Sequence, residues 1–282
     1  MDKIDSLLTQ YIEENKSKSP VREYQRLGYE IAHKLNDVKN AALYMRLAKN
    51  ERVEILEQTM RFVIDYKNCT NPTALFLWKL KELKREHKFI SVSNKRSVSI
   101  AVEALLNNKV IIFPTDTVYV MGCRLYSKGA IQKLYKAKKM SADEPVSVLI
   151  SDRETFFEIV KEDNDEIEKV FNRYSSGVFT FVVPVRKPKL YPSRVVDRSS
   201  KTVRLKIPDY KWICDVINKL GEPVVVTSAN LSRTKFPVQT SDISKDLVDH
   251  AEIVFSDEKH KMTGKSSKLI KIIDNTVEIL GE

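Results

Sequence analysis

Three short polar side chains, Thr115, Asp116 and Thr117, follow directly after an apolar run at residues 110–113. The run reads Val, Ile, Ile, Phe, which predicts a buried strand, and Pro114 ends it because proline cannot donate to a sheet ladder. Open α/β sheets usually bind their ligands at the carboxyl ends of strands. We therefore expect a ligand site at this turn. The alternative is a turn in which the threonine hydroxyls only cap the backbone.

A second pair of polar side chains, Ser228 and Asn230, follows another buried run at residues 224–226. Both lie in the turn that leaves this strand, where a hydroxyl and an amide could bind phosphate oxygens. Serine and asparagine are also usual residues of helix N-caps and Asx turns, and the sequence leaves that alternative open.

Residues 128–140 contain a group of cations that could bind an anion. Ile131, Leu134 and Tyr135 fall on one face of a predicted helix, and lysines cover the other face. The helix therefore brings three lysines to its C-terminal end: Lys136, Lys138 and Lys139. A lysine offers a point charge to an anion, although lysines at a helix end also complement the helix dipole.

The elements that must position these residues alternate between strands and helices along residues 97–282, which predicts a mixed α/β sheet. The expected strands are 110–113, 146–150, 179–185, 202–207, 224–227, 252–255, 268–273 and 277–280, and the expected helices are 97–107, 128–140, a pair within 153–174, and 210–220. Neither G-x-G-x-x-G nor a P-loop motif occurs, so we expect no Rossmann or P-loop nucleotide site.

Residues 1–88 are predicted to form a small all-helical domain of unknown role, because apolar residues recur there at helical spacing. The expected helices are 4–12, 22–35, 40–47, 51–64 and 74–83, the last of them preceded by a start signal at Asn71-Pro72. The polar stretch that follows lacks periodicity, and we place a linker at residues 89–96. Cations between Lys79 and Lys88 could face a phosphate backbone or form the solvated side of a helix.

The net charge of +10 favours polyanionic partners such as nucleotides or RNA, although a lysine-rich solvated surface has the same composition. The three cysteines form no C-x-x-C pair and the four histidines lack metal-ligand spacing, so we expect no metal ligands in the chain. The sequence shows no signal peptide and no apolar run long enough for a membrane span. We therefore expect a cytoplasmic protein with no membrane partner.

Several further segments occur in an order that resembles a known family. They are PTDTVY at 114–119, Y-x-x-K at 135–138, PVSVLI at 145–150, SSGVFTFVV at 175–183, TVRLKIPD at 202–209, VVVTSANLS at 224–232 and GKSSKLIKI at 264–272. Together they resemble the YrdC-like domain, the threonylcarbamoyl-AMP synthase family, over roughly residues 95–280. The resemblance implies a twisted, partly open mixed sheet with a positively charged concave face, here preceded by the small helical domain.

This family makes threonylcarbamoyl-adenylate from L-threonine, bicarbonate and ATP, and releases pyrophosphate. The threonylcarbamoyl group later reaches an adenosine beside the anticodon of certain tRNAs. The resemblance therefore implies a nucleotidyltransferase in tRNA modification, with Mg²⁺ accompanying the ATP. It also implies RNA or tRNA and tRNA-modification proteins as candidate partners.

The resemblance implies roles for individual residues. Thr115, Thr117, Thr180 and Arg204 would bind substrate, although Thr180 could be an ordinary strand residue and Arg204 a surface arginine. Lys138 matches the first lysine of the family's K-x-R pair and would hold the triphosphate. The residues implied for ATP binding are Lys136, Lys138, Ser228, Asn230 and Ser267, and those implied for catalysis are Lys138, Ser228 and Asn230.

Some positions depart from the family pattern. Met140 stands in place of the arginine of K-x-R, and Glu144 in place of a lysine, so two cations are lost and an anion is gained. Val120, Ser141, Ser176, Lys206 and Lys268 replace, in turn, a glycine, a proline, a second proline, an arginine and a threonine. The alternative function is therefore a catalytically impaired YrdC-like protein that binds RNA or nucleotides.

Overall fold

The computed structural model of this protein describes residues 22–66, 69–86, 88–161, 165–175, 177–232, 234–273 and 276–280. The chain divides into two compact units, one that ends at His87 and one that begins at Lys88. The helix expected at residues 4–12 lies outside the described residues. In the described ranges, the helices lack the combination of length and apolar character that crossing a membrane requires.

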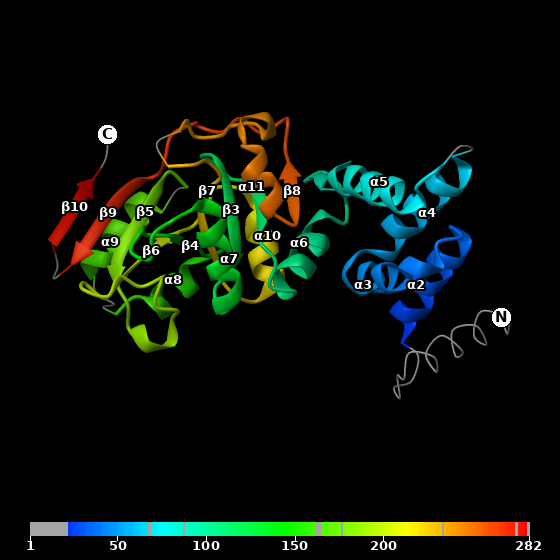
Figure 1. The fold of residues 1–282 in the computed structure, drawn as a ribbon. Helices are drawn as coiled ribbons and strands as arrows, with labels where there is room; N and C mark the ends of the chain where they lie inside the picture. Colours follow the sequence, from blue (N-terminus) through cyan, green and yellow to red (C-terminus); the bar gives the residue numbers. More distant parts are fainter. Residues whose placement is uncertain are drawn as a thin grey trace. The chain divides into compact units, whose positions relative to one another are not determined.

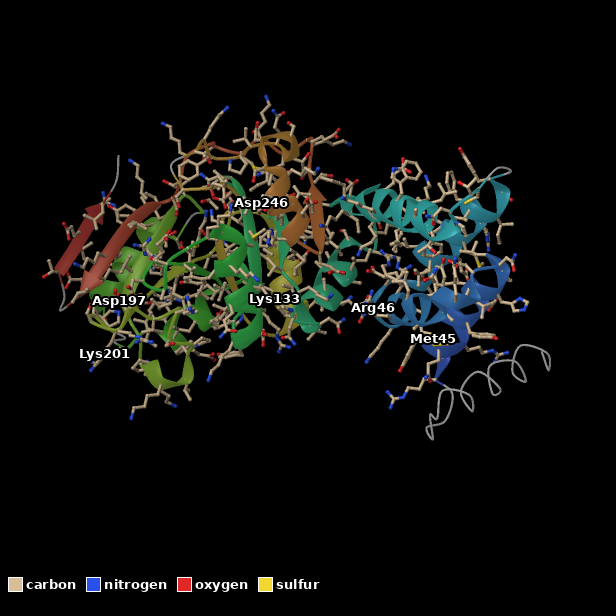
Figure 2. The ribbon with its side chains drawn as sticks, in the orientation of Figure 1. Met45, Arg46, Lys133, Asp197, Lys201 and Asp246 are labelled. Carbon is tan, nitrogen blue, oxygen red and sulfur yellow. The ribbon has the colours of Figure 1, made fainter. Side chains whose placement is uncertain are left out.

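The first unit is helical, as predicted. Its described helices are α2 (Glu23–Lys34), α3 (Ala41–Asn50), α4 (Val53–Asp65) and α5 (Pro72–Glu86). Tyr44, Leu56 and Phe76 are fully buried in its core. Helices α2 and α3 pack closely at Gly28, where an added Cβ would lie 2.3 Å from the Cα atom of Met45, labelled in Figure 2. A side chain at this position would therefore separate the two helices.

The second unit is built on a mixed sheet, which confirms the predicted fold class (Figure 1). Its described strands are β1 (Phe89–Ser91), β2 (Ile111–Pro114), β3 (Tyr119–Arg124), β4 (Ser147–Leu149), β5 (Phe179–Pro184), β6 (Thr202–Lys206), β7 (Val224–Ser228), β8 (Ile253–Ser256), β9 (Lys268–Ile273) and β10 (Thr276–Leu280). Their order across the sheet is β1-β8-β2-β3-β7-β4-β6-β5-β9-β10. The pairs β1/β8, β2/β8, β4/β6 and β5/β9 are parallel, and the other pairs are antiparallel.

Helices cover the two faces of the sheet unequally. One face packs on α7 (Lys128–Lys138), α8 (Arg153–Ile159), α9 (Asp165–Tyr174) and α11 (Lys245–His250). The other face packs on α6 (Ser97–Leu106) and α10 (Lys211–Leu220), whose apolar side chains meet those of β2, β3, β7 and β8. The hydrophobic cluster under these two helices contains no residue of β5, β6 or β9, so that part of the face is available for polar side chains.

The stretch predicted as a linker, residues 89–96, lies partly inside the sheet. Phe89–Ser91 forms β1 and pairs in parallel with Val254, Phe255 and Ser256 of β8. A three-residue strand is too short to show an alternating pattern, so periodicity could not reveal it. Helix α7 also ends earlier than the predicted Met140, because Lys139 adopts a left-handed conformation with φ 54°.

Candidate functional site

A cavity of about 400 Å³ lies on the sheet face that α6 and α10 leave uncovered. Successive side chains of a strand point to opposite faces, so Val203 and Leu205 of β6 enter the core while Arg204 and Lys206 face the cavity. The residues that line it are Thr115, Thr117, Val118, Val120, Pro145, Ser147, Leu149, Thr180, Arg204, Lys206, Val226, Thr227, Ser228, Phe236, Ser266, Ser267, Leu269 and Leu280. Hydroxyls and two cations thus lie over an apolar floor.

The two cations of β6 give the cavity a positive character, and no carboxylate is among the described residues that line it. Burial lowers the pKa of Arg204 and of Lys206, against the opposing influence of Asp197 on the first and Asp116 on the second. A buried cation is costly to hold without a partner. An anionic ligand in the cavity would offset part of that cost.

Asp116 and Lys206 form a buried ion pair beside the cavity. The Nζ atom of Lys206 donates to Oδ2 of Asp116 at 3.1 Å and to the hydroxyl of Thr117 at 3.0 Å. Burial raises the pKa of Asp116, with Lys206 opposing, and its second oxygen, Oδ1, is buried without a hydrogen-bond partner among the described residues. Gly177 makes room for this pair, because an added Cβ would lie 2.7 Å from Oδ2 of Asp116.

The two hydroxyls of the turn at Thr115 and Thr117 have different partners. The hydroxyl of Thr115 donates to the backbone oxygen of Val118 at 2.7 Å and lies 3.0 Å from the hydroxyl of Thr117. Thr115 therefore caps its own turn, whereas the hydroxyl of Thr117 joins that turn to Lys206. Both threonines line the cavity.

The three lysines at the end of α7 lie in different environments. Lys136 is exposed and is not among the residues that line the cavity. Lys139 pairs with Asp246 of α11 at 3.1 Å, and Asp246 is labelled in Figure 2. Lys138 is only 5% exposed, and burial lowers its pKa to about 8. All three lie at the C-terminal end of α7, as the sequence predicts, but their side chains differ in burial and in partners.

Lys138 lies behind the turn that follows β7. Its Nζ atom donates to the backbone oxygen of Ser228 at 2.6 Å and to that of Asn230. The hydroxyl of Ser228 in turn donates to Oδ1 of Asn230 at 2.6 Å, and Nδ2 of Asn230 donates to the backbone oxygen of Thr234 at 2.7 Å. Ser228 lines the cavity, whereas Lys138 and Asn230 are not among its lining residues. Lys138 therefore contacts the turn that borders the cavity, while its own side chain does not line the cavity.

The opposite wall of the cavity contains Thr180 and Ser267, whose hydroxyl oxygens lie 2.6 Å apart although the residues are 87 positions apart. Strands β5 and β9 pair in parallel, with Thr180 opposite Leu269, and this register brings the two hydroxyls together. Both residues line the cavity, as does Arg204. The cavity thus contains Thr115, Thr117, Thr180, Arg204, Ser228 and Ser267 of the residues singled out from the sequence.

Lys206 and Phe236 are the main lining residues that sequence reasoning did not select. Lys206 was noted only as a replacement for an arginine, yet the alternation of β6 places it on the same face as Arg204. Phe236 follows the turn after β7 and no local pattern marks it. Val120, which replaces a glycine of the family pattern, also lines the cavity, so its larger side chain lies at the site. Ser176 lies outside the described residues.

Comparison with known proteins agrees with this fold. The Sua5/YciO/YrdC family model, described as telomere recombination, matches residues 103–282. The threonylcarbamoyl-AMP synthase of Bacillus subtilis is 28% identical over 170 residues, which are 58% of this chain and 49% of that protein. The chain thus spans about half the length of this relative and of the threonylcarbamoyl-AMP synthase of Pyrococcus abyssi.

Two solved structures share the fold. The crystal structure of P. abyssi Sua5 complexed with L-threonine has a TM-score of 0.59 at 23% identity, covering 64% of this chain and 52% of that chain. E. coli YciO has a TM-score of 0.60 at 22% identity, covering 69% of this chain and 92% of that chain. At these identities the likeness concerns the fold alone. The family model, which matches most of the second unit, shows that this chain belongs to the Sua5/YciO/YrdC family.

Proposed function

We propose that this protein is an L-threonylcarbamoyladenylate synthase, which converts L-threonine, bicarbonate and ATP into threonylcarbamoyl-AMP and pyrophosphate. The observation that carries the proposal is the cavity, where Arg204 and Lys206 lie among hydroxyls and no carboxylate is among the described lining residues. Such a lining suits anionic substrates. The relatives named threonylcarbamoyl-AMP synthase support the reaction, and the L-threonine complex of P. abyssi Sua5 supports the amino acid.

The bonds that form in threonylcarbamoyl-AMP define what the site must do. The threonine nitrogen is joined to the bicarbonate carbon with loss of water, and an oxygen of the new carboxylate attacks the α-phosphorus while the bond to pyrophosphate breaks. Both reactants are anions, so the protein must hold them together and orient them. We assign Arg204 and Lys206 to the threonine carboxylate, with Thr115, Thr117 and Thr180 beside them. We assign Ser228, Asn230 and Ser267 to the nucleotide, with Lys138 holding the turn that carries the first two. We also assign Lys136, which is exposed at the end of α7, to ATP binding.

Mg²⁺ would enter with the nucleotide as part of the substrate. Within the described ranges, no group of three or more His, Cys, Asp or Glu residues could hold a metal ion, and no carboxylate is among the described lining residues. Mg²⁺ is usually held by phosphate oxygens and water rather than by an all-protein cage. We therefore expect turnover to require added Mg²⁺.

Threonine-dependent release of pyrophosphate is the direct test. The full chain with ATP, bicarbonate and Mg²⁺ should release pyrophosphate only when L-threonine is present, and Arg204→Gln should reduce this strongly. Arg173→Gln is the matched control, because Arg173 is exposed on α9 and is not among the lining residues. The proposal fails if folded protein at high concentration shows no threonine-dependent release.

One observation favours the second function, a YrdC-like protein that binds nucleotides or RNA without catalysis. Met140 packs against the hydrophobic core, and the carboxylate of Glu144 accepts a hydrogen bond from the backbone N–H of Ser141 at 2.7 Å. Neither position supplies a cation. Tight binding of ATP or tRNA without threonine-dependent turnover would support this function.

If the protein is a synthase, we propose that it acts in the cytoplasm beside other tRNA-modification proteins.

A further inference from the structure

A second cavity, of about 450 Å³, shares none of its described lining residues with the first. It lies at the amino end of β7, where Glu222 and Pro223 line it, whereas Ser228 of the first cavity lies at the carboxyl end of that strand. The rest of its lining comes from the turn after β3, from α8, from the end of α10 and from the loop at residues 186–191. The proposed synthase reaction uses none of these residues.

Two tyrosines form one side of this second cavity. The ring centroids of Tyr126 and Tyr191 lie 6.4 Å apart and the ring planes are inclined by 31°. Tyr126 is 53% exposed, so a ligand can reach its ring without rearrangement of the core. The face of an aromatic ring carries partial negative charge and attracts ammonium and guanidinium groups.

Of the three carboxylates that line this cavity, two already have partners. Arg124 binds Glu222 through two hydrogen bonds, at 2.7 and 2.9 Å. Asp152 caps α8 by accepting from the backbone N–H of Thr155 at 2.7 Å. Glu158 is exposed on α8 and has no ion pair among the residues that the structure describes. It is therefore the carboxylate that remains available to a ligand.

The lining of the second cavity holds both signs of charge, and the carboxylates are the charged groups that act on the two rings. Burial raises the pKa of Tyr126, with further contributions from Glu222 and Glu158, and burial likewise raises that of Tyr191, with contributions from Tyr126 and Glu158. Two cations also line the cavity: Arg186, whose Nε atom donates to the backbone oxygen of Val160 at 3.2 Å, and Lys187, which is exposed. Apart from each other, the two tyrosines are influenced by Glu158 and Glu222 among the described residues, so the rings lie in the acidic part of this lining, where a positive group can bind.

We propose that this second cavity is a binding site for an organic cation, an ammonium or guanidinium group that lies against Tyr126 and Tyr191 with Glu158 as its counter-ion. The group could belong to a free small molecule or to a lysine or arginine side chain of a partner protein. Both sources present the same chemistry to the rings. The experiment below distinguishes them.

Calorimetric titration of the full chain with tetramethylammonium and with ethylguanidinium tests the site, with sodium acetate as the anionic comparison. Tyr126→Leu and Glu158→Gln should each weaken cation binding about threefold to thirtyfold, whereas Tyr126→Phe should retain it because the ring face is unchanged. The matched controls Tyr66→Leu, at a tyrosine that is also 53% exposed, and Glu154→Gln, on the same helix, should bind as the wild type does. Added salt should weaken binding.

The source of the cation follows from a second titration, with spermidine in one arm and an arginine-rich peptide in the other. Tighter binding of the peptide than of spermidine assigns the site to a protein partner, and the reverse assigns it to a free small cation. Either result supports the proposed site if Tyr126→Leu weakens the binding of the tighter ligand. The proposal is overturned if neither simple cation binds at millimolar concentration, if acetate binds instead, or if the Tyr66 control weakens binding equally.

Discussion

The Nζ atom of Lys206 lies 3.1 Å from Oδ2 of Asp116, and the two side chains are 6% and 9% exposed. This pair joins strand β6 to the turn after β2. It therefore holds Thr115 and Thr117 beside Arg204 and Lys206 in the cavity. Removal of one member of a buried pair leaves an uncompensated charge, which is more costly than loss of the pair as a whole.

Lys206→Met should therefore lower the free energy of unfolding by about 3 to 5 kcal/mol, because Asp116 would remain buried without its cation. The double variant Lys206→Met, Asp116→Asn should recover part of this loss. Urea unfolding measures both. The exposed pair of Lys211 and Asp215 is the control, since Lys211→Met should change the free energy by less than about 1 kcal/mol. Equal losses in the single and double variants would contradict the prediction.

Lys138 should make stability depend on pH. Burial lowers its pKa from 10.5 to about 8, so between these values the unfolded chain binds the proton and the folded chain releases it. The free energy of unfolding should then rise with pH across this window, by up to about 3 kcal/mol, while below it both states are protonated and the cost of burying the charge remains.

Urea unfolding below about pH 8 and close to pH 10 measures this difference, with Lys138→Met as the variant that lacks the titrating amine. Lys136→Met, at an exposed lysine of the same helix, should keep the wild-type pH dependence. Parallel pH curves for the wild type and Lys138→Met would show that the amine does not titrate in this range. The KM for ATP should also rise above about pH 8 if the charge on Lys138 aids nucleotide binding.

The contrast between Lys138 and its neighbours shows how far the sequence could predict the site. Helical periodicity predicted that all three lysines end α7, and the motif order predicted that Lys138 and Asn230 belong to one site. The Lys138 amine donates to the backbone oxygen of Ser228, 90 positions away, and no local sequence pattern predicts a contact at that separation. The strands that position Thr115, Arg204 and Ser228 were predicted because each is a distinct apolar or alternating run.

Arg204→Gln should weaken binding of an anionic substrate about tenfold to a hundredfold, the usual range for loss of a hydrogen bond from a charged donor. Stability should change little or rise slightly, because burial already lowers the pKa of this arginine and its charge is held at a cost. Substrate binding by calorimetry and unfolding by urea separate the two effects. If unfolding free energy falls together with affinity, Arg204 has a structural role instead.

The hydroxyls of Thr180 and Ser267 should be energetically coupled, since their oxygens lie 2.6 Å apart and Thr180 is 1% exposed. Thr180→Val and Ser267→Ala should each lower the free energy of unfolding by about 0.5 to 1.5 kcal/mol, and the double variant should lose less than the sum. A double-mutant cycle by urea unfolding gives the coupling. Additive losses would mean that the two hydroxyls do not bond in solution.

The two proposed functions lead to opposite expectations for Met140→Arg. Met140 is only partly buried and packs at the edge of the core, so an arginine could extend its guanidinium to solvent with a stability cost of about 1 to 2 kcal/mol. If the protein binds nucleotides but catalyses poorly because it lacks the arginine of K-x-R, the variant should bind ATP more tightly. It should also raise threonine-dependent pyrophosphate release at least about tenfold. If the wild type already turns over, the gain should be small.

Met140→Leu serves as the matched control for the Met140→Arg comparison, because it keeps the apolar contact without adding charge. Equal rates for the arginine and leucine variants, with wild-type turnover in both, would place the triphosphate away from residue 140 and leave the hydroxyl turn and the cations of β6 as its binding groups. A tenfold gain specific to the arginine would instead show that this chain has lost one cation of a site that is otherwise complete.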